Sequence, residues 1–128
     1  MVMENQMKIM LILEEVAMAA LGIYFLTQYS LGLSFWIWLI LFFSPDIGML
    51  GYLLNTQIGA FTYNLFHHKG LALAIAAAGY FLKIDLMTSI GILLFAHSSF
   101  DRVMGYGLKY ADDFKHTHLG WLSLKQAK

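Results

Sequence analysis

Histidine and aspartate at helical spacing are the residues of this chain with the clearest capacity for chemistry. His97 and Asp101 stand four residues apart, so both side chains project from one face of a helix. This spacing suits two ligands of one metal ion, or a carboxylate that orients an imidazole for proton transfer. The alternative for an isolated pair is that Asp101 only forms an ion pair with Arg102, Lys109 or a lysine of the tail at a membrane interface.

Other ionisable residues lie in two earlier apolar segments. Glu14 and Glu15 are adjacent, and neighbouring side chains on a helix point about 100° apart, so at most one of them faces the interior. We expect this to be Glu14. Asp46 follows Pro45, which removes a backbone hydrogen bond and leaves carbonyls free for a cation or a water. The alternative is a simple helix kink, but a kink does not need an acid.

Four more histidines accompany these acids. Asn64 lies three residues before His67 and four before His68, so either histidine can share a helix face with the asparagine. His116 and His118 lie in a polar tail, where His118 could fold back as a lid or a last ligand. The alternative for this segment is a solvated tail.

The composition describes the environment of these residues. Of the 128 residues, 59% are hydrophobic and only 12% are charged, which places the chain among membrane proteins. The absence of cysteine excludes disulfides and cysteine-ligated metal centres. Eight basic and eight acidic residues cancel, which gives no argument for nucleic acid as a partner. No glycine-rich phosphate loop, nucleophile elbow or HExxH motif occurs, so nucleotide chemistry is not supported.

Four apolar runs must position the ionisable residues. A bilayer is spanned by about 20 apolar residues, and the runs cover residues 8–28, 34–54, 68–82 and 86–108, followed by a polar tail at 109–128. The segment at residues 58–66 is short and amphipathic, and we expect it to form an interfacial or re-entrant helix. The first run carries two glutamates and is too long for a cleavable signal peptide. The sequence therefore predicts one all-α domain over residues 1–128, a four-helix transmembrane bundle.

The lysines predict the orientation of this bundle. With four spans, one side of the membrane holds six of them: Lys8, Lys69, Lys109, Lys115, Lys125 and Lys128. The other side holds only Lys83, so the positive-inside rule places both termini in the cytoplasm. In this orientation the polar residues of all four runs converge on the cytoplasmic half of the bundle. An ionisable group in hydrocarbon costs about 2.5 to 3.5 kcal/mol or more, so such residues usually serve a site.

Motifs throughout the chain carry a family resemblance. They are Leu-Glu at residues 13–14, Ser-Pro-Asp-Ile-Gly-Met-Leu-Gly-Tyr at 44–52, Tyr-Asn-Leu-Phe-His at 63–67, His-x-x-x-Asp-Arg-Val-Met-Gly-Tyr-Gly-Leu-Lys-Tyr at 97–110 and Phe-x-x-Thr-His-Leu-Gly at 114–120. From about Leu11 to Gly120 the chain resembles a bacterial family of uncharacterised proteins, the domain of unknown function 4260. The resemblance implies a small protein of the bacterial inner membrane. It selects the residues Glu14, Asp46, Asn64, His67, His97, Asp101, Arg102 and His118.

A more distant analogy concerns the transmembrane metal-dependent hydrolases that include alkaline ceramidases. Their zinc site also uses histidines, a serine and aspartates at the cytosolic side of a helical bundle, with a His-x-x-x-Asp motif on one helix. This chain departs from them because it has four expected helices instead of seven. It also has His116-x-His118 where they have a His-x-x-x-His pair. The likeness is therefore one of chemistry and not of fold.

Three functions follow as hypotheses. The first is a metal-dependent membrane hydrolase of a lipid-like substrate that enters laterally, with one divalent ion, zinc favoured. Its ligands are His67, His97, His118 and either Asp46 or Asp101, and Asn64 and Arg102 support them. Glu14 or the remaining aspartate acts as general base. The second is a non-enzymatic module that binds or transports a small ligand or cation, whose glycines offer packing surfaces for a homo-oligomer. The third is a polar network that only specifies helix packing.

Overall fold

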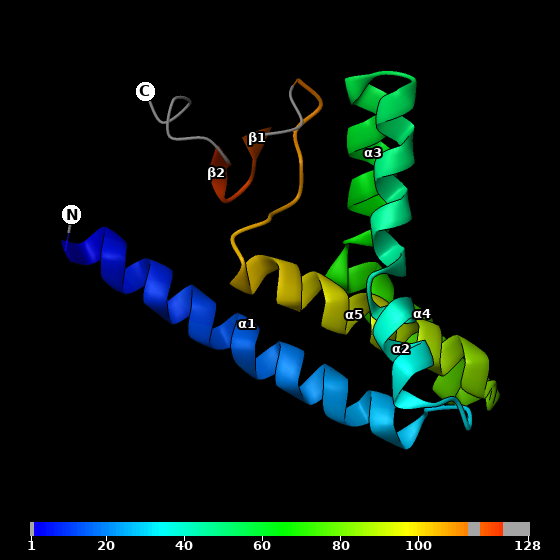
Figure 1. The fold of residues 1–128 in the computed structure, drawn as a ribbon. Coiled ribbons are helices and arrows are strands. Elements are labelled where there is room, and N and C mark those ends of the chain that lie inside the picture. Colours follow the sequence, from blue (N-terminus) through cyan, green and yellow to red (C-terminus); the bar gives the residue numbers. More distant parts are fainter. Residues whose placement is uncertain (1, 113–115, 122–128) are drawn as a thin grey trace.

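The computed structural model describes residues 2–112 and 116–121. Within these residues the chain forms five α-helices, one 3-10 helix and a short antiparallel ribbon (Figure 1). The elements are α1 Val2–Gln28, α2 Phe35–Phe42, η1 Ser44–Leu53, α3 Thr56–Phe66, α4 Lys69–Leu82, α5 Asp85–Val103, β1 His116–Thr117 and β2 Gly120–Trp121. The expected all-α class is confirmed.

Helix α5 lies between α1 and α4 and packs along both (Figure 1). Small residues let these backbones approach closely, as they do in membrane helix pairs. A Cβ atom added to Gly91 of α5 would lie 2.3 Å from the backbone nitrogen of Ala76 in α4. On the other side, a Cβ atom added to Gly22 of α1 would lie 2.9 Å from the Cβ of Ala96. The three helices therefore form one closely packed layer.

The 3-10 helix η1 and helix α3 form an antiparallel hairpin that projects away from this layer (Figure 1). The predicted break at Pro45 is confirmed, because α2 ends at Phe42 and η1 begins at Ser44 with the proline in its first turn. The hairpin turns at Asn55, whose side chain caps α3 by accepting a 2.7 Å hydrogen bond from the Ile58 amide. The η1–α3 hairpin carries two of the polar residues back toward α5.

Two described stretches, Glu4–Gln28 and Phe35–Leu53, are long and apolar enough to cross a membrane. Helices α3 and α4 together are also long and apolar enough, and they are bent by 43° where they meet. The pair is therefore a third candidate, either as a broken span or as a re-entrant loop. Residues 58–66 thus lie within α3, which packs on η1. Helix α5 is not among these candidates, because its buried face is polar, with Thr88, Ser89, His97, Ser98, Ser99 and Asp101.

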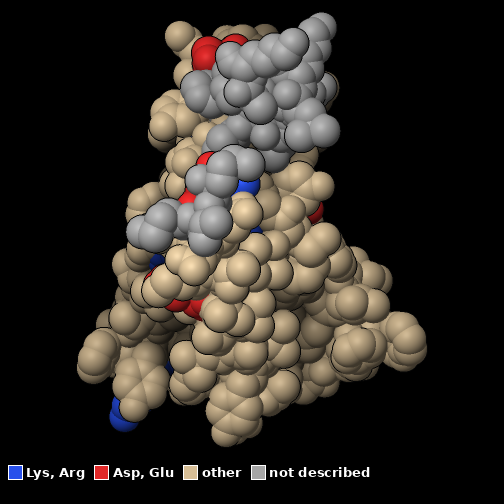
Figure 2. Space-filling model, turned by 90° about the vertical axis from the view of Figure 1, so that its left-hand side faces the viewer, with Lys and Arg blue, Asp and Glu red and all other residues tan. Residues whose placement is uncertain are grey.

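The distribution of side chains supports a membrane environment. Many large apolar side chains are exposed, such as Trp36 and Ile40, whereas the buried set is rich in polar residues. Figure 2 shows a face on which uncharged residues predominate and charged atoms occupy small patches. A water-soluble monomer rarely exposes apolar area on this scale. The polar interior of the layer is therefore the part of the molecule to examine for function.

Candidate metal centre

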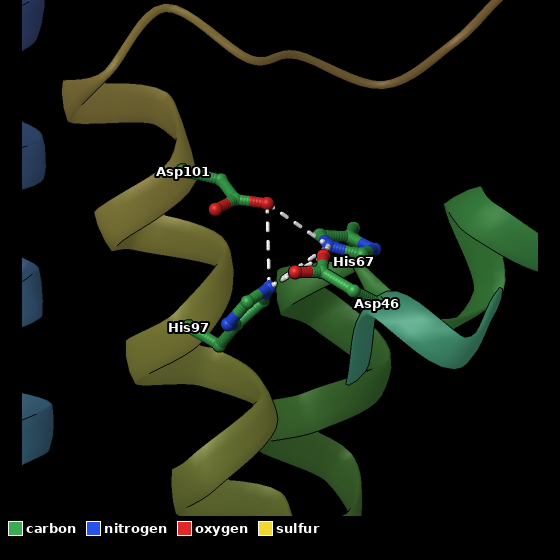
Figure 3. A group of neighbouring side chains, drawn as sticks. All are labelled: Asp46, His67, His97 and Asp101. Carbon is green, nitrogen blue, oxygen red and sulfur yellow. Dashed lines mark hydrogen bonds and ion pairs between the residues drawn. The ribbon is translucent and has the colours of Figure 1, made fainter. Parts of the chain in front are cut away.

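Four metal-ligating side chains from three segments meet at one point (Figure 3). Asp46 comes from the first turn of η1, His67 from the end of α3, and His97 and Asp101 from successive turns of α5. One ligand atom of each residue lies within 4.8 Å of those of the other three. The centre thus joins the η1–α3 hairpin to the helical layer.

The separations between the ligand atoms are short and similar. The Nε2 atoms of His67 and His97 lie 3.1 Å apart. The Asp101 Oδ2 lies 3.0 Å from the His67 Nε2 and 3.3 Å from the His97 Nε2, and the Asp46 Oδ1 lies 3.4 and 3.2 Å from the same two atoms. A tetrahedral zinc ion with nitrogen and oxygen ligands at about 2.0 to 2.1 Å has ligand atoms about 3.3 to 3.4 Å apart. These five separations are close to that spacing and also suit hydrogen bonds and ion pairs, so the four side chains form a group that could hold a metal ion.

The protonation of His67 supports the same conclusion. Its Nδ1 lies 2.8 Å from the carbonyl oxygen of Tyr63, and a carbonyl only accepts, so this nitrogen carries a hydrogen. A neutral His67 then directs the lone pair of Nε2 toward two carboxylates and another imidazole. Such converging lone pairs require a positive charge between them, either a metal ion or added protons. A backbone carbonyl on the second ring nitrogen is also the usual arrangement of a metal-binding histidine.

Burial distinguishes Asp46 from the other three residues. The side chains of His97, His67 and Asp101 are 0%, 4% and 13% exposed, whereas the side chain of Asp46 is 39% exposed. The centre is therefore enclosed on three sides and accessible from the side of Asp46.

A stack of side chains holds His67 in place. The Tyr63 ring lies parallel to the His67 ring, with centroids 3.9 Å apart and planes 11° apart. The ammonium group of Lys109 lies 4.6 Å from the centroid of the Tyr63 ring. The sequence predicted no role for Tyr63, and it predicted Lys109 only as an alternative ion-pair partner of Asp101 and as one of the cytoplasmic lysines. The four-residue spacing of Tyr63 and His67 was the available signal for the first, whereas no local signal placed Lys109 there.

Asn64 and Arg102, expected as supporting residues, fix the backbone around the centre. The side-chain Nδ2 of Asn64 donates to the backbone carbonyl oxygen of Lys109 at 2.7 Å, and its Oδ1 accepts from the backbone amide of Lys109 at 2.6 Å. The guanidinium of Arg102 donates to the carbonyl oxygen of His67 at 3.2 Å. These bonds tie the end of α3 to the end of α5 and to the segment that follows it.

That segment begins where α5 ends, in a turn that Gly105 permits. Gly105 has a φ of +93°, and its amide donates to the Arg102 carbonyl while the Tyr106 amide donates to the Asp101 carbonyl at 2.8 Å. This pattern is a Schellman motif, which satisfies the last carbonyls of a helix. Helix α5 therefore ends at Val103, before the expected limit of residue 108.

Aromatic rings enclose His97 on the side of α2. The His97 ring makes edge contacts with Phe42 at 5.5 Å and Phe43 at 6.3 Å between centroids, and Phe100 packs on both phenylalanines. These three phenylalanines also line an apolar cavity of about 530 Å³ between α1 and α2. The His97 Nδ1 is buried and has no hydrogen-bond partner among the described residues. An apolar cavity thus adjoins the metal centre.

His118, expected as the third histidine ligand, is not part of the centre. Its Nδ1 accepts a 2.7 Å hydrogen bond from the Leu108 amide, which holds the ribbon against the segment after α5. Burial, and next the positive charge of Arg102, lower the pKa of His118 below its usual range. The metal-ligating position expected for His118 is instead taken by Asp46, so both aspartates belong to the group.

The expectation that Glu14 faces the interior is wrong. Glu14 is exposed, and Glu15 is the buried neighbour at 8% exposure. Lys69 at the start of α4 bonds both carboxylate oxygens of Glu15, one of them at 2.7 Å, and this ion pair fixes which glutamate turns inward. His68 is exposed and caps α4 by accepting from the Leu71 amide at 2.9 Å.

Comparisons with known proteins identify the family. No curated protein and no solved structure matches the chain significantly. The family model described as a domain of unknown function, DUF4260, matches residues 8–122. This range includes every residue of the metal centre. Because the match covers most of the 128 residues, the chain belongs to the DUF4260 family.

Proposed function

We propose that this chain is an integral membrane metalloprotein that hydrolyses a lipid-like substrate. His67, His97 and Asp101 would hold one divalent ion, with Asp46 beside it, and zinc is favoured because the donors are nitrogen and carboxylate oxygen. The observation that carries this proposal is the convergence of the His67 Nε2, the His97 Nε2 and the Asp101 Oδ2, which lie 3.0 to 3.3 Å from one another and are largely buried.

The burial of the four side chains suggests which of them bind the ion and which acts as the base. His67, His97 and Asp101 are the enclosed ligands, and three protein ligands leave one position open in catalytic zinc sites. Asp46 is half-exposed and lies beside this position, so it is suited to hold and deprotonate a water. A bound zinc ion would lower the pKa of that water and polarise a substrate carbonyl. Glu14, which is exposed, is the weaker choice of base.

The adjoining cavity supports a substrate with an apolar chain. Its wall is almost entirely apolar, and two of its wall residues, Phe42 and Phe43, contact the His97 ring. An acyl chain in this cavity would place its polar end near His97, because these two rings contact the imidazole. Entry between α1 and α2 would be lateral, from the bilayer.

We also infer a four-span arrangement in the bacterial inner membrane, with both termini in the cytoplasm. Helix α5 is the fourth span in this proposal. Its 19 residues extend about 28 Å at 1.5 Å per residue, close to the hydrocarbon thickness. Packing between α1 and α4 shields its polar face from lipid, which is how polar groups are tolerated at this depth. The lysine distribution supports the orientation.

Elemental analysis of the purified protein tests the metal centre. We expect one equivalent of transition metal in the natural chain and in the His118→Ala variant, and loss of the metal in His97→Ala. His118→Ala is a matched control because it removes a histidine outside the centre. Metal-free natural protein that stays folded and takes up no zinc on titration would overturn the proposal.

Hydrolysis is tested with a short-chain phospholipid ester in detergent micelles. The Asp46→Asn variant should keep its metal and lose most of the activity, because the amide cannot accept a proton from water. Equal activity of Asp46→Asn and the natural chain would remove Asp46 as the base. Absence of hydrolysis by a metal-loaded protein would contradict the enzymatic part of the proposal.

One observation favours a second function, cation binding for transport. Asp46 lies where α2 gives way to η1, and transporters often place ion sites at such helix breaks. Flux of a divalent cation into vesicles that depends on Asp46, without hydrolysis, would identify this function.

A further inference from the structure

A second cavity, of about 520 Å³, lies between α1, the start of α4 and the end of α5. It is separate from the apolar cavity, and none of the four residues of the metal centre lines it. Its lining combines charged side chains with apolar ones such as Leu11 and Met18. The charged and titratable members are Lys8, Glu14, Glu15, Lys69, Arg102 and His118.

The formal charges of the residues that line this cavity sum to +1, because Lys8, Lys69 and Arg102 stand against Glu14 and Glu15. Glu15 and Lys69 neutralise each other in an ion pair whose side chains are only 10% and 17% exposed. Glu14 and Lys8 are exposed, and the Lys8 ammonium lies 3.9 Å from a carboxylate oxygen of Glu4. Arg102 remains, and it forms no ion pair with a described residue. Its one hydrogen bond among the described residues goes to the neutral carbonyl of His67, so further guanidinium N–H groups remain available.

His118 adds a second donor. Its Nδ1 accepts from the Leu108 amide, so in the neutral ring the hydrogen is on Nε2. Burial and the charge of Arg102 both lower the pKa of His118, which favours this neutral form. The cavity is thus lined by a guanidinium and an imidazole that can both donate, beside apolar walls.

We propose that this cavity binds a phosphate group, with Arg102 as its main partner and His118 as a second donor. A guanidinium recognises phosphate through paired, charge-assisted hydrogen bonds, and one net positive charge complements one phosphodiester. The apolar walls suit the glycerol and first methylenes of a lipid, although free phosphate has the same recognition chemistry. The site goes beyond the proposed hydrolase, and binding of phosphate there requires no metal ion.

Calorimetric titration of delipidated protein in a phosphate-free maltoside detergent tests this site. The probes are inorganic phosphate, a short-chain phosphatidylglycerol and a diacylglycerol with the same acyl chains. Arg102→Gln should weaken binding of the phosphate-containing probe about tenfold or more. Lys83→Gln, a lysine at the far end of α4, should leave it unchanged. Glu15→Gln should strengthen binding, because it removes a negative charge beside the cavity.

The two opposite effects separate binding from loss of folding, since a misfolded variant would not bind more tightly. Saturation by inorganic phosphate alone, with the same dependence on Arg102, would identify free phosphate as the ligand. Binding of phosphatidylglycerol without binding of inorganic phosphate would identify a lipid headgroup. Equal affinity for phosphatidylglycerol and diacylglycerol, or equal affinity of the Arg102→Gln and Lys83→Gln variants, would overturn the proposal.

Discussion

The Nε2 atoms of His67 and His97 lie 3.1 Å apart, although 30 positions separate the two residues in the chain. One nitrogen is delivered by the end of α3 and the other by the middle of α5. His67 carries its hydrogen on the opposite nitrogen, toward Tyr63, so the short contact is between a lone pair and a second imidazole. A shared cation would resolve this contact, and the two aspartates beside it would supply the compensating negative charge.

Zinc should stabilise the natural chain against thermal unfolding. Free zinc at about 100 times its dissociation constant contributes about 2.7 kcal/mol to a folded state that alone binds it. A His67→Ala variant should show no such increase, whereas His68→Ala should respond like the natural chain, because His68 lies outside the centre. Scanning calorimetry in detergent with and without zinc provides the measurement. An equal response of both variants would contradict the assignment of His67 as a ligand.

Replacing Tyr63 by leucine should weaken metal binding without removing a ligand. The parallel stack with His67 fixes the orientation of the imidazole, and loss of such outer partners typically costs about 10- to 100-fold in metal affinity. Competition with a zinc chelator measures this affinity. Tyr80→Leu is the control, because Tyr80 is 62% exposed and distant in sequence from the centre. Unchanged affinity in Tyr63→Leu would show that the stack does not position His67.

Asn64→Ala should release the segment after α5. The variant loses both side-chain hydrogen bonds to the Lys109 backbone, each worth about 0.5 to 1.5 kcal/mol. We expect faster hydrogen exchange of the Lys109 amide, measured by mass spectrometry, and a lower unfolding temperature. The Asn55→Ala variant removes the cap of α3 and should destabilise the protein without selectively exposing Lys109. Equal exchange at Lys109 in both variants would contradict the role of Asn64.

His118 should make the stability of the protein sensitive to acid. Its pKa is lowered in the folded state by burial and by Arg102, so the unfolded chain binds the proton more readily. Its contribution to stability is therefore present above the unfolded pKa of about 6.5 and is lost as the pH falls below that value. A His118→Asn variant keeps a hydrogen-bond acceptor for the Leu108 amide but does not titrate. Between about pH 7 and pH 5, denaturant unfolding should show a smaller loss of stability in this variant. An identical pH dependence of the unfolding free energy in the natural chain and in the variant would contradict the lowered pKa of His118.

The sequence predicted the features that depend on neighbouring residues. The apolar runs predict the helices and indicate a membrane environment, because backbone groups in lipid must be paired within the segment. Pro45 ends α2 through its missing amide hydrogen. The shared face of His97 and Asp101 follows from helical periodicity alone.

The tertiary structure decided which distant side chains join that pair. The helix crossings bring His67 and Asp46 to α5, while the bond from Leu108 holds His118 away. The choice between Glu14 and Glu15 likewise depends on Lys69, which is 54 positions from Glu15. Residue spacing along one helix predicts neither outcome. Adjacent side chains on a helix point about 100° apart, so a rotation of the helix by that angle changes which of them faces a neighbouring helix. The packing of α1 and α4 on α5, together with the contacts of Asp46 and His67 with the side chains of α5, fixes those rotations.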